Sequence, residues 1–98
     1  MAEYQITSWR ELPSLVTARD GKDIAKVQLA PRFQLAIDEA AMRLGDTGSE
    51  DYLAGWTRTE WTAAQGTADE VVSAVTGELE QGWPQARLDE YLDALLPN

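Results

Sequence analysis

The sequence predicts an α+β domain, in which a small antiparallel sheet of about four strands carries helices on one face, in the order βββαβαα. Three local signals support this prediction. The pair Asp20-Gly21 lies between two β-prone runs and is typical of a tight hairpin turn. Pro31, followed by apolar residues at steps of three and four, indicates an amphipathic helix. Thr67, with Glu70 three residues later, matches a capping box and marks the start of another helix.

Three β-prone runs precede the first predicted helix. Residues Tyr4–Trp9 alternate on two faces and are rich in aromatic and β-branched types, which predicts a strand. Pro13 pushes the residue before it into an extended conformation, so we expect a bend over Glu11–Ser14. The runs Ser14–Arg19 and Asp23–Leu29 carry apolar residues on both faces, and we therefore expect them to be interior strands of the sheet.

The clearest predicted helix covers Pro31–Leu44. Gly45 ends it, at a position where a left-handed backbone is needed. The segment after Gly45 is expected to be a loop over 46–49, and Ser49 can cap a short helical turn through Leu53. The residues expected to face the core share one stripe of the helix: Phe33, Ala36, Ile37, Ala40 and Leu44.

The remaining elements are one strand and two helices. The run Gly55–Ala63 alternates and predicts a single strand. In the helix that follows Thr67, Gly77 is unfavourable by about 1 kcal/mol relative to alanine, which indicates close packing at that point. A last helix is expected between Pro84 and Pro97. The apolar residues of these two helices are Val71, Val72, Val75, Leu79 and Trp83, then Leu88, Tyr91, Leu92 and Leu95.

Composition limits what the protein can do. The chain has 98 residues, enough for one core, so we expect a single domain over residues 1–98. It contains no histidine and no cysteine. This excludes Ser-His-Asp and Cys-His catalysis and removes the usual ligands of transition metals. We therefore expect a protein that is not an enzyme and that uses no cofactor and no metal.

The sequence also bears on location. No apolar run approaches the roughly 20 residues that span a bilayer. The segment Met1–Gln5 lacks the basic and apolar regions of a signal peptide. The lack of cysteine agrees with a reducing compartment. We expect a cytoplasmic location and no membrane partner.

Charge is unevenly distributed along the chain. The net charge is −9. From Gly45 onward only Arg58 and Arg87 oppose a series of carboxylates, which are expected to form solvated helix faces or to meet a basic partner. This field repels polyanions and no basic stripe compensates for it, so we expect no nucleic-acid partner. Lys26, in the middle of a predicted strand, is expected on an exposed sheet face.

Aromatic and arginine residues form the candidate binding surface. The pair Trp9-Arg10 closes the first predicted strand, while Trp56, Arg58 and Trp61 belong to the last. If these strands are neighbours, indole and guanidinium groups can stack, each contact contributing roughly 0.5–2 kcal/mol. Tryptophan and arginine are enriched in binding hot spots. The alternative is that the tryptophans cover the core and the arginines lie over them.

Several runs carry a resemblance to a known family. They are Trp9-Arg10-x-Leu12-Pro13-x-x-Val16-x-Ala18, Lys26-x-x-Leu29, Arg32-Phe33-Gln34-x-Ala36-Ile37-Asp38-x-Ala40-Ala41-Met42 and Tyr52-Leu53-x-x-Trp56. Over about Tyr4–Trp61 the chain resembles the small bacterial "virulence factor" domain family, and it is similar to a domain of conserved virulence factor C, where helical HEAT repeats are attached. The resemblance implies a stand-alone bacterial domain without assignable catalytic residues. It also implies an association with folate and corrinoid one-carbon enzymes.

Three functional hypotheses follow. The first is a non-catalytic accessory or protein-interaction domain whose partner is another protein. The second is a small-molecule binding module, or a weak enzyme, that holds an anionic group such as a folate carboxylate with Arg10, Arg32 or Arg58. The third is a homodimer in which the aromatic face is the dimer interface. The sequence leaves monomer and homodimer open.

Overall fold

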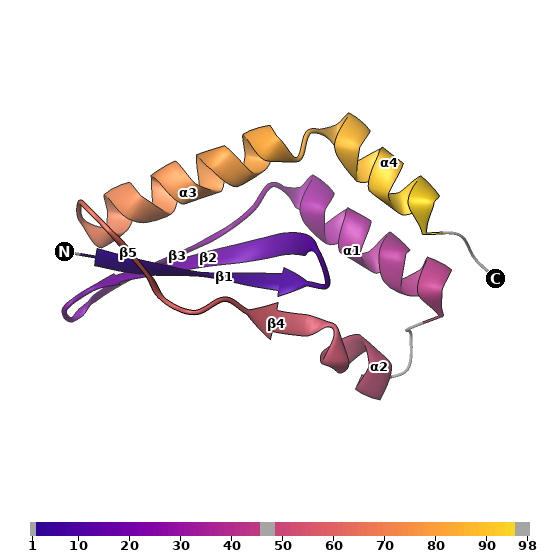
Figure 1. Ribbon diagram of the computed structural model, residues 1–98, viewed down its shortest axis with the longest axis horizontal. Coiled ribbons are helices and arrows are strands. Elements are labelled where there is room, and N and C mark those ends of the chain that lie inside the picture. The colour runs from indigo at the N-terminus through magenta and orange to yellow at the C-terminus, as the bar shows by residue number, and fades with distance from the viewer. Residues whose placement is uncertain (1, 46–48, 96–98) are drawn as a thin grey trace.

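The computed structural model describes residues 2–45 and 49–95, with only the backbone described at Ser49 and Asp51. These residues form an open antiparallel sheet and four helices, which confirms the α+β class (Figure 1). The strands are β1 (Ala2–Trp9), β2 (Leu12–Asp20), β3 (Asp23–Gln28), β4 (Trp56–Arg58) and β5 (Thr62–Ala64). The helices are α1 (Pro31–Leu44), α2 (Ser49–Ala54), α3 (Ala68–Gly82) and α4 (Gln85–Ala94).

The strand order of the sheet is β3-β2-β1-β4, with β5 pairing with β1 as well. The interior strands are therefore β1 and β2, and the expectation that the run Asp23–Leu29 is interior is wrong. Strand β3 lies at the edge, and Ile24 on it is 65% exposed. β3 carries apolar residues on both faces, but α3 packs over only one face of this strand, so apolar residues on both faces do not imply burial on both faces.

The turn between β1 and β2 lies earlier than expected. It consists of Arg10 and Glu11, and Arg10 takes a left-handed conformation with φ of 54°. Pro13 is already part of β2, opposite Ser8, where the ladder shifts register. A proline lacks the backbone N–H that a regular ladder uses, but a bulge removes that requirement.

The predicted strand Gly55–Ala63 is divided into β4 and β5. Between them, the backbone N–H of Thr59 donates to the Ile6 carbonyl at 3.0 Å. The Thr59 side-chain oxygen accepts from the Ile6 N–H, also at 3.0 Å. Because a side chain replaces the backbone acceptor here, the ladder is interrupted and the chain arches away from β1 at Glu60 and Trp61.

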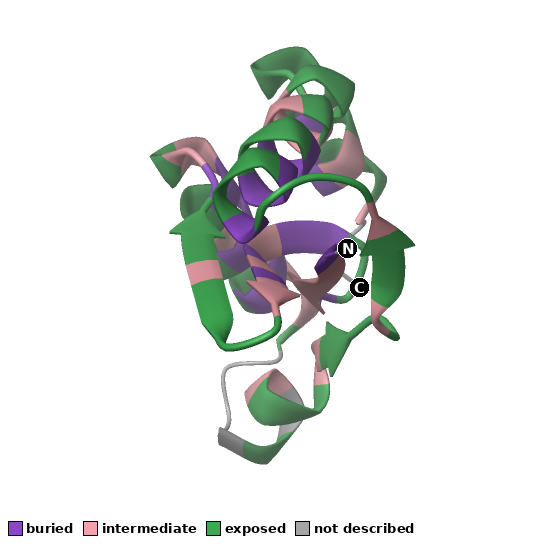
Figure 2. Cartoon of the chain, turned by 90° about the vertical axis from the view of Figure 1, so that its left-hand side faces the viewer, coloured by how far each residue is buried: buried purple, intermediate pink, exposed green. Residues whose placement is uncertain are grey.

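The core lies between the sheet and the helices. Helix α3 crosses β1, β2 and β3 on one face, α1 packs on β2, and α4 packs on α1 (Figures 1 and 2). Phe33 and Ile37 of α1 are fully buried, as expected. On the opposite face of β1–β3 the described elements include no long helix, and only the short helix α2 lies on that side, against the Trp9 end of β1; we call this the open face (Figure 1).

Helix α3 begins and packs largely as its sequence indicates. The capping box is confirmed, since Thr67 Oγ1 accepts from the Glu70 N–H at 3.2 Å and the Thr67 N–H donates to the Glu70 carboxylate at 3.0 Å. Val71 and Val75 are buried, whereas Leu79 is only half-buried. The expectation of close packing at Gly77 is wrong, because a Cβ atom there would have nothing within 4 Å.

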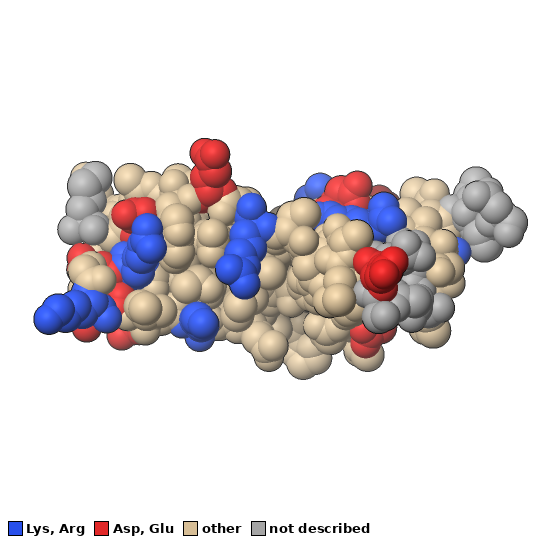
Figure 3. All heavy atoms as spheres, turned by 90° about the horizontal axis from the view of Figure 1, so that it is seen from below, with Lys and Arg blue, Asp and Glu red and all other residues tan. Residues whose placement is uncertain are grey.

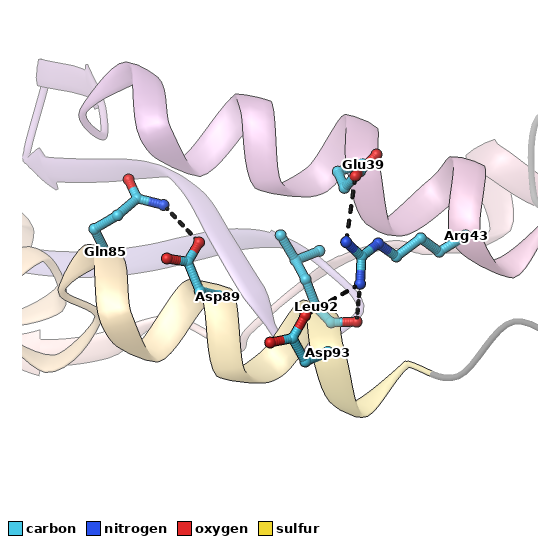
Figure 4. Close-up of polar contacts among 6 residues, drawn as sticks. All are labelled: Glu39, Arg43, Gln85, Asp89, Leu92 and Asp93. Atoms are coloured by element: carbon cyan, nitrogen blue, oxygen red, sulfur yellow. Dashed lines mark hydrogen bonds and ion pairs between the residues drawn. The ribbon is translucent and has the colours of Figure 1, made fainter.

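Two arginines of α1 hold the ends of the other long helices. Arg32 donates to the Glu80 carbonyl at 2.9 Å, at the end of α3. Arg43 donates to the Leu92 carbonyl of α4 at 2.7 Å and pairs with Asp93 at 3.5 Å (Figure 4). The last carbonyls of a helix lack intrahelical partners and carry partial negative charge, so a cation there stabilises the helix. The guanidinium of Arg32 is therefore engaged in intramolecular hydrogen bonds.

The short helix expected after the first long one is present as α2. Of the loop expected over 46–49, residues 46–48 lie outside the described residues, and Ser49 already belongs to α2. The capping side chain of Ser49 and the expected helix end at Pro97 also lie outside the described residues. In the part of the chain that is described, no helix combines the length and hydrophobicity needed to cross a membrane.

Candidate functional site

Trp9 belongs to the core and to no surface. Its exposed fraction is 0%. Its indole N–H donates to the Tyr52 carbonyl at 2.8 Å, and its ring stacks on the Tyr52 ring with centroids 5.9 Å apart. Gly55 lies directly against the indole. The expectation that Trp9 takes part in a recognition surface is wrong, because α2 and the residue that follows it cover this side chain.

Arg10 and Trp56 lie around Trp9 at the same end of the sheet. Trp56 pairs with Trp9 across β1 and β4, is half-buried, and meets the edge of the Tyr52 ring at 6.0 Å. The Arg10 guanidinium lies 5.2 Å from the Trp9 ring centroid. These residues form an aromatic cluster that closes the core, which corresponds to the alternative in which tryptophans cover the core and an arginine lies over them.

Arg58 and Trp61 lie apart from that cluster, on the open face. There they line a hollow of about 260 Å³, which we call the sheet hollow. Its lining residues come from β1, β2, β3, β4 and the arch after β4: Gln5, Leu15, Thr17, Arg19, Ile24, Lys26, Arg58 and Trp61. Two of the five residues of the candidate surface therefore meet here, together with two further cations.

The register of the strands explains why this part of the face is hollow. Across the middle row, Gln5 of β1 pairs with Thr17 of β2, and Thr17 pairs with Lys26 of β3. The centre of the row is thus a small threonine, while long side chains stand on the outer strands. On β4, Arg58 pairs with Thr7, one row further along β1. The small Thr17 at the centre of longer neighbours leaves a concave floor.

Trp61 is held against the hollow by Arg19. The Arg19 guanidinium carbon lies 3.8 Å from the centroid of the Trp61 ring, a cation–π contact. The same guanidinium pairs with the Glu3 carboxylate at 3.3 Å. Arg19 therefore has its charge balanced by Glu3, and its main contribution is to fix the indole at one end of the sheet hollow.

The electrostatics of the sheet hollow differ from those of the whole chain. The net charge of the protein is −9, yet no carboxylate is among the residues that line the hollow. Lys26 and Arg58 are both exposed, and neither has an ion-pair partner within residues 2–45 and 49–95. Lys and Arg side chains are visible around this face in the view from below (Figure 3). The sheet hollow is thus a local cationic site on an acidic protein.

Sequence reasoning missed Arg19 and treated Lys26 as an ordinary exposed lysine. The exposure of Lys26 is confirmed. A signal for both was present in the hairpin: a two-residue turn after Asp20 fixes the register, which sets Lys26 opposite Thr17 and keeps Arg19 on the same face as Thr17. The partner on the other side, Arg58, depends on a pairing of β1 with β4 that no local pattern fixes.

Other surfaces offer less chemistry. A larger groove of about 370 Å³ lies beside the start of α1, and its lining is neutral: Ser14, Gln28, Leu29, Pro31, Phe33, Gln34 and Leu35. Nowhere in the described chain do three or more carboxylates gather in a way that could hold a metal ion. The three arginines proposed for an anionic ligand do not converge, because Arg10 lies by Trp9, Arg32 caps α3 and Arg58 lines the sheet hollow.

Comparison with known proteins identifies the family. The model of the family described as "Virulence factor" matches residues 7–92, which include all of the sheet hollow except Gln5. No curated protein and no solved structure matches the chain. Since the match covers most of the sequence, the chain belongs to the virulence factor family.

Proposed function

We propose that this domain is a non-catalytic protein-interaction module, and that its partner binds to the sheet hollow through an acidic segment. One observation carries the proposal: Lys26 and Arg58, both exposed, flank a concave surface that contains an indole and no carboxylate. Arginine and tryptophan are the residue types on which binding energy concentrates. Cations without an internal partner favour a ligand that brings negative charge.

The chemistry of the lining supports a binding role. Its side chains offer guanidinium, ammonium, amide, hydroxyl, indole and alkyl groups. No imidazole, carboxylate, phenol or thiol, the groups that most often act as a general base, is among the residues that line the hollow. The lining can therefore attract, orient and cover a ligand, which is the work of an interaction surface.

A second copy of the chain fits the sheet hollow poorly. In a two-fold dimer each patch meets itself, so Lys26 and Arg58 would face the same cations of the other copy. A large anionic small molecule also fits poorly, because ligand sites usually enclose about 300–1,000 Å³, more than the 260 Å³ of this hollow. A few side chains of a partner protein match the space better. A cytoplasmic location and the link to folate and corrinoid enzymes stay predictions.

The test is affinity capture from the source cells with two matched variants. Lys26→Glu changes a residue of the sheet hollow, whereas Lys22→Glu makes the same chemical change in the exposed turn between β2 and β3. Both alter the net charge equally. We expect the partner to be lost with Lys26→Glu and with Arg58→Glu, and kept with Lys22→Glu, while the three variants, which carry the same net charge, melt alike. Equal recovery of the partner by Lys26→Glu and Lys22→Glu would contradict the proposal.

A further inference from the structure

Lys26 and Arg58 have no ion-pair partner among the described residues, and their positions point to the form of the ligand; this step rests on the proposed function. We infer that the sheet hollow recognises a short extended segment that crosses the strands, with one carboxylate at Lys26, another at Arg58 and an apolar side chain between them. The class of ligand is thus an acidic linear peptide in which two acids are separated by several residues.

The spacing follows from the register. Lys26 is on β3 and Arg58 on β4, and the strand order β3-β2-β1-β4 places three strand spacings between them. The register also shifts Arg58 by two residues along β1 relative to Lys26. With strands about 4.8 Å apart and about 3.4 Å per residue, their Cα atoms are roughly 16 Å apart. An extended peptide advances about 3.3 Å per residue, and long side chains shorten the span. Two acids three to five residues apart therefore meet the two cations.

The middle of the sheet hollow favours an apolar side chain. Leu15 and Ile24, the latter 65% exposed, supply aliphatic surface on the two sides of the row formed by Thr17 and Lys26. The Trp61 indole, fixed by Arg19, closes one end. A leucine-sized side chain gains free energy in proportion to the apolar area that it buries there. An apolar residue between the two acids therefore adds affinity that a simple polyanion lacks.

Lys26 and Arg58 attract a short acidic segment even though the net charge of the protein is negative. At physiological ionic strength the Debye length is about 8 Å. The carboxylates of α3 lie on the other side of the sheet, and packed layers stand about 10 Å apart. The nearby Glu3 carboxylate is paired with Arg19 at 3.3 Å, so a segment in the sheet hollow responds mainly to Lys26 and Arg58. A nucleic acid extends well beyond two cations and meets the repulsion of the whole chain, whose net charge is −9.

Two peptides of identical composition test the inference. In Ac-Gly-Glu-Gly-Leu-Gly-Glu-Gly-NH2 the acids flank the leucine, and in Ac-Gly-Glu-Glu-Gly-Leu-Gly-Gly-NH2 they are adjacent. Affinities for the purified domain are measured by titration calorimetry. We expect the spaced peptide to bind about two- to five-fold more tightly, which is the gain from one additional exposed ion pair. The advantage should disappear with Lys26→Ala and with Arg58→Ala, and persist with Lys22→Ala.

The outcomes separate this inference from the proposed function. Equal affinities of the two peptides would overturn the crossing mode. If, in that case, Lys26→Glu still loses the cellular partner and Lys22→Glu keeps it, the interaction role stands and only the crossing mode is wrong. If Lys26→Glu also keeps the partner, both fail. Tighter binding of a short oligothymidylate than of the spaced peptide would overturn the protein ligand itself.

Discussion

Substitution by alanine is expected to have opposite effects on the free energy of unfolding at Gly55 and at Gly77. A Cβ atom at Gly55 would lie 2.4 Å from Nε1 of the Trp9 indole, whereas a Cβ atom at Gly77 would have nothing within 4 Å. Neither glycine has a positive φ, so alanine fits both backbones without strain. Gly55→Ala therefore reports on the packing of Trp9, and Gly77→Ala reports on helix propensity alone.

The magnitudes follow from these contacts. Trp9 is fully buried and donates to the Tyr52 carbonyl at 2.8 Å, so it cannot move aside without losing a hydrogen bond. Overpacking costs about 1–3 kcal/mol, and loss of the hydrogen bond costs about 0.5–1.5 kcal/mol. Gly55→Ala should thus lower the free energy of unfolding by about 1.5–4.5 kcal/mol. Gly77→Ala should raise it by about 1 kcal/mol, because alanine favours helix.

Urea unfolding followed by far-UV circular dichroism measures both changes. A difference of 1 kcal/mol shifts the melting temperature by about 4–8 °C in a domain of this size, so thermal melts resolve the two variants as well. A Gly55→Ala variant as stable as the wild type would refute the tight packing of Gly55 on Trp9. A destabilised Gly77→Ala variant would show a close contact at that helix face.

Three further predictions concern stability. Phe33→Ala should lower the free energy of unfolding by about 3–5 kcal/mol, because Phe33 is 1% exposed; a calorimetric change below about 1 kcal/mol would contradict its place in the core. Raising NaCl from low to physiological strength should raise the unfolding midpoint, since salt screens the repulsion within a chain of charge −9; a falling midpoint would show that attractive ion pairs dominate. Burial, then the hydrogen bond and charge of Glu11, raise the pKa of the Tyr91 phenol above its usual 10.0, so the folded state holds this proton more tightly than the unfolded state. Stability should therefore be intact below about pH 10 and fall above it, and Tyr91→Phe should flatten that fall in urea midpoints; an equal loss in both proteins would contradict the role of Tyr91.

Local signals predicted the elements that local physics controls. The Asp20-Gly21 turn, the capping box at Thr67 and the bounds of α1 need only neighbouring residues, and the structure confirms all three. The division of Gly55–Ala63 could not be predicted in this way. The division depends on the Thr59 side-chain oxygen, which takes the place of a backbone acceptor in the ladder. The N–H that it accepts from belongs to Ile6, on a strand more than 50 residues earlier.

The candidate site was only partly predictable for the same reason. An aromatic residue at a strand end can face solvent or core, and Trp9 faces the core because Tyr52, 43 residues later, covers it. The role of Lys26 follows from the hairpin register and could have been derived from the sequence. The position of Lys26 relative to Arg58 could not be derived from the sequence. β1 and β4 are far apart along the chain, and their pairing covers only a few residues.

Nuclear magnetic resonance titration of the labelled domain with the spaced peptide tests the central claim most directly. If the sheet hollow is the recognition surface, the amides of Thr17, Lys26 and Arg58 and the indole N–H of Trp61 should shift together and saturate with one affinity. The indole N–H of Trp9, buried in the core, should stay unchanged. Shifts confined to α3 and α4, or no saturable shift at the sheet hollow, would contradict the claim.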